Sequence, residues 1–387
     1  MINFLRLVGR FAVITAIVAV IAVAWKWDNI KRLLAVNELF AEENIISNFS
    51  HMSNVFYSTE LVLPDATPSP LEVAARDMPE SLDGWVEDRS LTALVVLKDG
   101  KLAHEAYFKG TDTTDLRISW SVAKSFLSGL MGIVVAEGLI ESLDDPVTKY
   151  VEKLVGTAYD GVSIRNVLNM ASGVAFDEDY LDFNSDINKM GRVLALGWSM
   201  DGFAADLHNR DRPAGEAWQY VSIDTHVLGM VIRGATGRDI PELMVEKILT
   251  PLGLEANPAY LTDGKGVAFV LGGLNLRTRD YARFGQMYLQ NGLYNDQQIV
   301  PADWVLESTA PSAPTAEGGI QYGYQWWMAP DASDGEYFAR GIYGQYIYVN
   351  EQMGVVIAVN SADRSFQEPG AFDQNLRMFR EITRSLQ

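Results

Sequence analysis

Strand-forming segments at two widely separated places most constrain the fold of this chain. Residues 91–97 and 102–108 are apolar runs joined by a short segment that contains Asp-Gly, a strong signal for a β-hairpin turn. Strand patterns return far downstream, at 345–350 and 354–360, again with a short connection. Because the two pairs lie near opposite ends of the chain, we expect one sheet to be built from both ends.

The middle of the chain, from residue 121 to about 310, has mainly helical periodicity, and a last helix is expected over about 371–385. Chain ends that form a sheet around a helical middle indicate an α/β domain with an insertion. We therefore expect an α/β (α+β) fold in which an antiparallel sheet is flanked by helices and an all-helical domain is inserted. The domain should span 71–387, with 71–120 and about 311–387 forming the α/β part.

Ser121 and Lys124 are the strongest candidates for chemistry. Ser121 precedes apolar residues at helical spacing, so it should open a buried helix on which Lys124 shares its face. A serine hydroxyl becomes an effective nucleophile when a nearby base takes its proton. Lysine can be that base if burial lowers its pKa. The alternative interpretation is an ordinary serine at a helix start with a lysine in an ion pair.

Two further segments that follow Lys124 in the chain are also candidates, and their order indicates a family. Tyr220 stands two residues before Ser222 and ahead of an apolar helical run, and Gly341 lies in a turn that leads into a strand near the C-terminus. Serine-x-x-lysine, tyrosine-x-polar and a glycine-bearing strand, in this order, are typical of the penicillin-recognising serine hydrolases. The chain thus resembles the serine β-lactamase-like superfamily. Within it, the chain is similar to 6-aminohexanoate-dimer hydrolases and family VIII-type carboxylesterases.

Three secondary segments strengthen the resemblance, which covers about residues 61–387. Residues 168–173 look like the L-x-x-x-S-G helix end of the family, 272–285 like its G-G-L to A-R-F-G segment, and 322–327 like another recurrent block. The resemblance implies a β-lactamase/transpeptidase-like fold with the site in the cleft between its two parts.

The resemblance also implies a role for each candidate. Ser121 would form an acyl-enzyme, and Lys124 would act as base and proton relay. Tyr220 would protonate the leaving group, which requires a lowered phenol pKa; otherwise it is a tyrosine packed under a helix. The backbone N–H groups of Ser121 and Ile342 would form the oxyanion hole.

Substrate contacts are expected from seven residues: Glu178, Tyr180, Ser222, Arg340, Gly341, Tyr343 and Gln345. Penicillin-binding enzymes carry Lys-Thr-Gly or His-Thr-Gly where this chain has Ala339-Arg340-Gly341. The hydroxyl and cation that would hold a β-lactam carboxylate are therefore missing, which argues against antibiotic hydrolysis.

Composition excludes several other functions. A net charge of −19 argues against nucleic-acid binding, which needs clustered Lys and Arg. With no cysteine, disulfides and thiolate chemistry are excluded, and the four histidines have no metal-binding spacing. No G-x-S-x-G motif is present. We therefore expect a mechanism without a metal or an organic cofactor.

The N-terminus predicts a membrane segment. Two arginines precede an apolar run from Phe11 to Trp25, which we interpret within residues 1–27 as an uncleaved signal anchor or, alternatively, a cleaved signal peptide. The catalytic domain would then be exported, anchored to the inner membrane and facing the periplasm, or periplasmic if the signal is cleaved. Residues 28–70 would form a helical extension, packed on the domain or along the membrane, with a proline-rich linker at 64–70.

The sequence therefore predicts a serine hydrolase that cleaves a small-molecule ester or linear amide. A β-lactamase or D-amino-acid peptidase is the alternative, for which Arg340 or another residue would have to bind a carboxylate. A non-catalytic, membrane-anchored binding protein is a further alternative.

Overall fold

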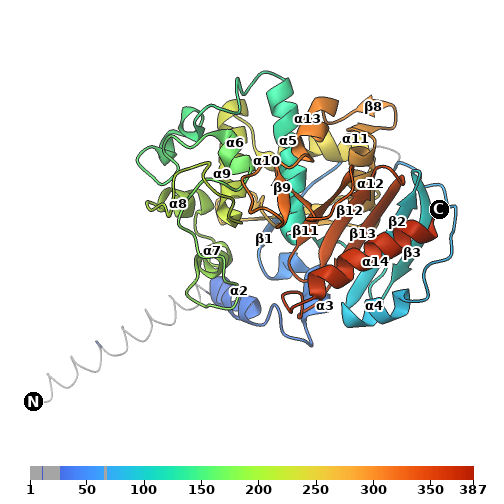
Figure 1. The fold of residues 1–387 in the computed structure, drawn as a ribbon. Helices are drawn as coiled ribbons and strands as arrows, with labels where there is room; N and C mark the ends of the chain where they lie inside the picture. The colour runs from blue at the N-terminus through green and yellow to red at the C-terminus, as the bar shows by residue number, and fades with distance from the viewer. Residues whose placement is uncertain (1–10, 12–26, 65–67) are drawn as a thin grey trace, which may run out of the picture.

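The computed structural model describes residue 11, residues 27–64 and residues 68–387 (Figure 1). The expected signal anchor therefore lies almost wholly outside the described residues. Among the helices that are described, none combines the length and the apolar character needed to cross a membrane.

The α-helices of the described residues are α2 (Trp27–Asn37), α3 (Ile45–Ser50), α4 (Leu82–Asp88), α5 (Ala123–Ala136), α6 (Ile164–Leu168), α7 (Asp186–Ala195), α8 (Met200–Ala205), α9 (Ser222–Thr236), α10 (Ile240–Met244), α11 (Thr250–Leu252), α12 (Thr278–Leu289), α13 (Ala302–Ser308) and α14 (Ala371–Ser385). The strands are β1 (Tyr57–Glu60), β2 (Leu91–Lys98), β3 (Lys101–Tyr107), β4 (Arg117–Ile118), β5 (Ala259–Thr262), β6 (Leu274–Leu276), β7 (Leu293–Tyr294), β8 (Gln297–Gln298), β9 (Gln321–Gly323), β10 (Trp326–Met328), β11 (Glu336–Gly341), β12 (Gln345–Asn350) and β13 (Val355–Ser361).

The main sheet joins the two ends of the chain, as the sequence predicts. Its strand order is β3-β2-β13-β12-β11-β10-β9, and every neighbouring pair is antiparallel. Asp99 and Gly100 form the β2–β3 turn with φ values of 51° and 76°, the left-handed conformation that a tight hairpin needs. The antiparallel sheet flanked by helices is thus confirmed.

Both faces of the sheet are covered, which explains why its central strands are apolar without alternation. In β2, Val95 and Leu97 belong to the core beneath α5 and α12, whereas Leu94 and Val96 face the core formed with α4 and α14 (Figure 1). Gly285 lets α12 lie close to the sheet, since a Cβ there would come within 2.6 Å of the Val356 side chain.

The inserted part is not all-helical, so that expectation is wrong. A second, four-stranded sheet has the order β1-β5-β6-β4, and both β5 and β6 come from the middle of the chain. Strands of four and three residues are too short to give a clear alternating pattern.

The described part of the extension, up to residue 64 and from residue 68, packs on the domain and is integrated into it. Strand β1 pairs with β5, and Phe49 is completely buried in the main core. Buried Arg117 joins the two parts, because its guanidinium donates hydrogen bonds to the Ile46 carbonyl oxygen at 3.0 Å and to Thr92 Oγ1 at 3.0 Å. Strand pairing, a buried side chain and these hydrogen bonds therefore join the described part of the extension to the catalytic part.

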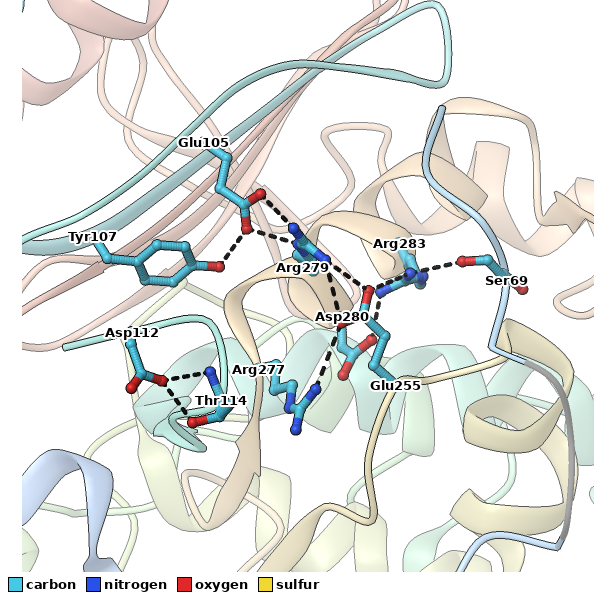
Figure 2. Close-up of polar contacts among 10 residues, drawn as sticks. All are labelled: Ser69, Glu105, Tyr107, Asp112, Thr114, Glu255, Arg277, Arg279, Asp280 and Arg283. Atoms are coloured by element: carbon cyan, nitrogen blue, oxygen red, sulfur yellow. Dashed lines mark hydrogen bonds and ion pairs between the residues drawn. The ribbon is translucent and has the colours of Figure 1, made fainter. Parts of the chain in front are cut away.

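A buried ion network ties the end of the linker to α12 (Figure 2). The Arg283 guanidinium contacts Asp280 at 2.8 Å, Glu255 at 2.7 Å and the Ser69 carbonyl oxygen at 2.7 Å. Arg279 on the same helix contacts a Glu105 oxygen on β3 at 2.6 Å. This network anchors α12 between the sheet and the loop that follows α11.

Candidate active site

Ser121 stands where strand β4 passes into helix α5. A short 3-10 turn, η2 (Trp120–Val122), connects them, and the Ser119 N–H donates to the Leu274 carbonyl oxygen of β6 at 2.8 Å. Trp120 has φ of 41°, an uncommon conformation for a residue with a side chain. Ser121 keeps partial solvent access, whereas the α5 residues that follow it are buried through Val134. The helix predicted after Ser121 is confirmed.

Lys124 contacts Ser121 directly. Its Nζ lies 2.9 Å from Ser121 Oγ, 3.3 Å from Ser222 Oγ and 2.9 Å from the Leu271 carbonyl oxygen. The lysine is 1% exposed, and no carboxylate of the described residues forms an ion pair with it. Lys124 therefore contacts Ser121 and does not form the structural ion pair of the alternative interpretation.

Burial lowers the pKa of Lys124 from 10.5 to about 7, because the ammonium form loses its hydration. The negative charge of Glu178 opposes this fall only partly. A lysine with a pKa near 7 is substantially neutral at neutral pH and can accept a proton from Ser121. Desolvation thus gives Lys124 the neutral form that a base would need.

Tyr220 stands beside this pair, but its phenol differs from the expectation. Burial raises the pKa of Tyr220, and the charge of Glu178 adds to the rise, while the hydroxyl of Ser121 opposes it. The lowered phenol pKa expected from the sequence is therefore wrong. A neutral phenol can donate and pass on a proton, and it cannot act as a phenolate base. The Tyr220 ring lies with its centroid 5.3 Å from Lys124 Nζ.

Ser222, Glu178 and Tyr180 form one hydrogen-bonded group next to Lys124. The Ser222 N–H donates to Glu178 Oε2 at 2.9 Å, and its hydroxyl donates to Glu178 Oε1. Tyr180 Oη also donates to Oε1, at 2.7 Å. Glu178 thus accepts three hydrogen bonds, and its charge is held near the Lys124 nitrogen.

The end of β11 lies against Ser121, as an oxyanion hole requires. A Cβ on Gly341 would come within 3.1 Å of the Ser121 nitrogen and 2.8 Å of the Ser119 carbonyl oxygen. Glycine is therefore needed for the close approach that places Ile342 at the same cavity as Ser121.

Two residues expected to bind substrate, Arg340 and Gln345, do not line the cavity beside Ser121. The Arg340 guanidinium carbon lies 5.8 Å from the Trp327 ring centroid and 4.8 Å from that of Phe372, and Arg340 does not line the cavity beside Ser121. Gln345 is buried, and its amide donates to the Tyr343 and Ser361 carbonyl oxygens at 3.1 and 2.7 Å. Gln345 holds the β11–β12 turn and does not face the cavity.

A cavity of about 350 Å³ opens beside Ser121 and is partly built by residues that the sequence reasoning missed. Phe40 and Phe56 from the N-terminal extension line it together with Tyr180, Ser222 and Tyr343. The only sequence signal for this wall is the apolar character of the extension, which does not distinguish a site from a core.

The histidines do not form a metal site. Within the described ranges no group of three or more His, Asp or Glu side chains is placed to hold a metal ion. His226, which is near Tyr220 in sequence, is buried and has its Nε2 2.8 Å from Asp201 Oδ1. His226 therefore belongs to a separate polar pair.

Comparison with known proteins agrees with the family that the sequence motifs indicate. Residues 87–377 match the family model described as Beta-lactamase. The 6-aminohexanoate-dimer hydrolase of Paenarthrobacter ureafaciens is 30% identical over 302 residues, which are 74% of this chain and 76% of that protein. A Bacillus anthracis structure described as a candidate 6-aminohexanoate-dimer hydrolase superposes with a TM-score of 0.80 at 22% identity, covering 90% of this chain and 96% of that one. A D-stereospecific amidohydrolase from Streptomyces sp. has a TM-score of 0.56 at 21% identity, with 75% and 97% covered.

Proposed function

Because this chain belongs to the β-lactamase family of serine hydrolases, we propose that it cleaves a carboxylic ester or a linear amide through an acyl-enzyme on Ser121. One observation carries this proposal: buried Lys124 has its Nζ 2.9 Å from Ser121 Oγ, and its pKa is lowered to about 7. This pair supplies both a nucleophile and a base that is neutral at physiological pH.

The reaction follows from the positions of these groups. Ser121 Oγ attacks the substrate carbonyl carbon while Lys124 Nζ takes its proton. The N–H groups of Ser121 and Ile342 stabilise the resulting oxyanion. The Tyr220 hydroxyl passes its proton to the leaving oxygen or nitrogen while the Lys124 ammonium replaces it. Because this relay is concerted and forms no free phenolate, it does not need a lowered phenol pKa. Lys124 Nζ then takes a proton from a water molecule, whose oxygen attacks the acyl carbon. The bond to Ser121 Oγ breaks, Oγ takes the proton back from Lys124, and the acid is released.

The substrate class is supported by the relatives and by the surroundings of Arg340. One relative is named for a linear amide dimer. A β-lactamase or D-amino-acid peptidase needs a cation facing the substrate carboxylate. The Arg340 guanidinium lies beside the Trp327 and Phe372 rings and outside the lining of the cavity beside Ser121, although its charge acts on Tyr220. Cleavage of esters and linear amides needs no such cation.

The proposal is tested by labelling with a fluorophosphonate followed by mass spectrometry. We expect one adduct, on Ser121, and turnover of a nitrophenyl ester. Ser121→Ala should lose the adduct and roughly 10³-fold or more of the activity. Ser119→Ala is the matched control, since Ser119 is buried two residues away and should leave both unchanged. An unlabelled Ser121 in folded protein would contradict the proposal and favour a non-catalytic binding protein.

We also propose that residues 1–27 anchor the protein in the inner membrane, with the domain facing the periplasm. Support comes from the two arginines before the apolar run Phe11–Trp25. Cell fractionation and protease accessibility in spheroplasts test this. Recovery of the full-length chain in the cytosolic fraction would contradict it, and an N-terminus beginning after residue 24 would identify a cleaved signal instead.

A further inference from the structure

The cavity beside Ser121 has apolar walls contributed by three distant segments. They are the extension before the linker, helix α7 and the loop between β5 and β6, represented by Leu39, Phe40, Ile187, Met190, Leu194 and Phe269. Ser121 and Ser222 line the same cavity. A volume of about 350 Å³ is enough for a small organic group.

The charge of its lining limits which groups this cavity can bind. Among the described residues that line it, the one charged side chain is Arg192, and none is Asp or Glu. The Arg192 guanidinium donates to the Phe183 carbonyl oxygen at 2.8 Å and lies 4.2 Å from the Phe183 ring centroid. An ammonium group entering here would lose its hydration and meet no carboxylate among the lining residues. The adjacent Glu178 carboxylate already accepts hydrogen bonds from Ser222 and Tyr180.

The position of the cavity indicates whether it binds the acyl group or the leaving group of a substrate. Ser121 and Ile342, whose N–H groups face the carbonyl oxygen in the proposed mechanism, both line it, whereas Tyr220 does not. Since Tyr220 delivers the proton to the leaving group, the leaving group departs on the Tyr220 side. The acyl chain, on the other side of the carbonyl carbon, then points into the cavity.

We propose, on the basis of the serine-hydrolase function above, that this cavity binds the acyl group and selects an uncharged aliphatic chain longer than butyryl. A 6-aminohexanoyl group, which has a terminal ammonium, is disfavoured. The chain therefore differs in acyl specificity from the relative named for the 6-aminohexanoate dimer.

The test measures kcat/KM of the full-length protein on nitrophenyl esters from acetate to decanoate, together with the matched pair hexanoate and 6-aminohexanoate. We expect a rise of about fourfold per methylene from acetate to hexanoate, as transfer of each methylene from water predicts. Hexanoate should be preferred over 6-aminohexanoate by about tenfold or more, because the ammonium is desolvated without a partner.

Two variants separate cavity filling from charge. Met190→Trp should lower the hexanoate-to-acetate ratio by about tenfold, because the indole occupies the space of the chain. Arg192→Glu should raise the relative rate on 6-aminohexanoate by about fivefold or more, because a cation is replaced by an anion. Leu306→Trp, at an exposed position on α13, is the control and should leave both ratios unchanged. Thermal unfolding of each variant checks folding, with Ile187→Trp as the second cavity-filling variant.

A flat chain-length profile, or 6-aminohexanoate cleaved as fast as hexanoate, would overturn this inference while Ser121-dependent turnover leaves the proposed function intact. Failure of fluorophosphonate to label Ser121 would overturn both.

Discussion

Phe40 stacks on Tyr343, with ring centroids 4.6 Å apart and ring planes inclined by 15°. Phe40 belongs to the N-terminal extension, and Tyr343 follows Ile342 in the turn after β11. Trp120, directly before Ser121, has its ring centroid 5.8 Å from that of Phe40. The extension thus supports both backbone segments from which the proposed oxyanion hole is built.

Phe40→Ala should therefore reduce both stability and catalysis. We expect a loss of about 2 kcal/mol in the free energy of unfolding, below the range for a fully buried phenylalanine because Phe40 is only partly buried. The value of kcat on a short ester should fall as well, since the Ile342 turn loses its support. Phe108→Ala is the control, because Phe108 packs against the opposite core. Equal kcat losses in both variants would contradict this account.

The activity should depend on the ionisation of Lys124. At pH values below its pKa of about 7, Lys124 is protonated and cannot accept the Ser121 proton. We therefore expect kcat/KM to rise with pH between 6 and 8 and then to level off. The pH profile of nitrophenyl acetate hydrolysis measures this. A profile that is flat across this range would show that Lys124 does not act as the base.

The same burial makes Lys124 costly for stability. Between pH 7 and 10.5 the unfolded chain holds a proton on this lysine that the folded chain lacks, so stability rises with pH across this window. Lys124→Met should abolish activity and stabilise the fold by about 1–3 kcal/mol at pH 7, because one pKa unit corresponds to about 1.4 kcal/mol and lost hydrogen bonds offset part of the gain. The gain should shrink toward pH 10. Urea unfolding at several pH values, with exposed Lys265→Met as the control, measures this; a destabilised Lys124→Met would contradict it.

Tyr220→Phe should affect substrates according to their leaving groups. Nitrophenolate leaves without a proton, whereas an alkoxide or amine needs one, so the loss should be small on nitrophenyl esters and about 10²-fold or more on alkyl esters or amides. Comparing kcat/KM for a nitrophenyl ester and an ethyl ester of the same acid measures this difference. Equal losses on both would assign Tyr220 a packing role.

The network of Figure 2 should dominate the stability of α12. Arg283 and Asp280 are each 1% exposed, so Arg283→Met leaves a buried carboxylate without its partner and should cost about 3–5 kcal/mol. Arg238→Met, which removes an exposed pair with Glu242, should cost less than about 1 kcal/mol. Urea unfolding compares the two, and equal costs would contradict the assignment.

The β2–β3 and β12–β13 strand pairs, the last helix and the start of the catalytic helix could be predicted from the sequence. The Asp99-Gly100 turn, the helix over 371–385 and the helical spacing after Ser121 are local signals, since each depends on residues a few positions apart. The order of Ser121, Lys124 and Tyr220 also indicated the family.

What the sequence alone determined is therefore local: the strands at the two ends of the main sheet, the longer helices and the candidates for chemistry. Only the tertiary structure decided how these candidates behave. The pKa of Lys124 falls and that of Tyr220 rises because both are desolvated, and desolvation depends on every segment that packs around a group. Likewise, Phe40 stacks on Tyr343, and the Gln345 amide bonds to Ser361 and does not face the cavity. These contacts join distant segments, and the local sequence of each segment does not predict them.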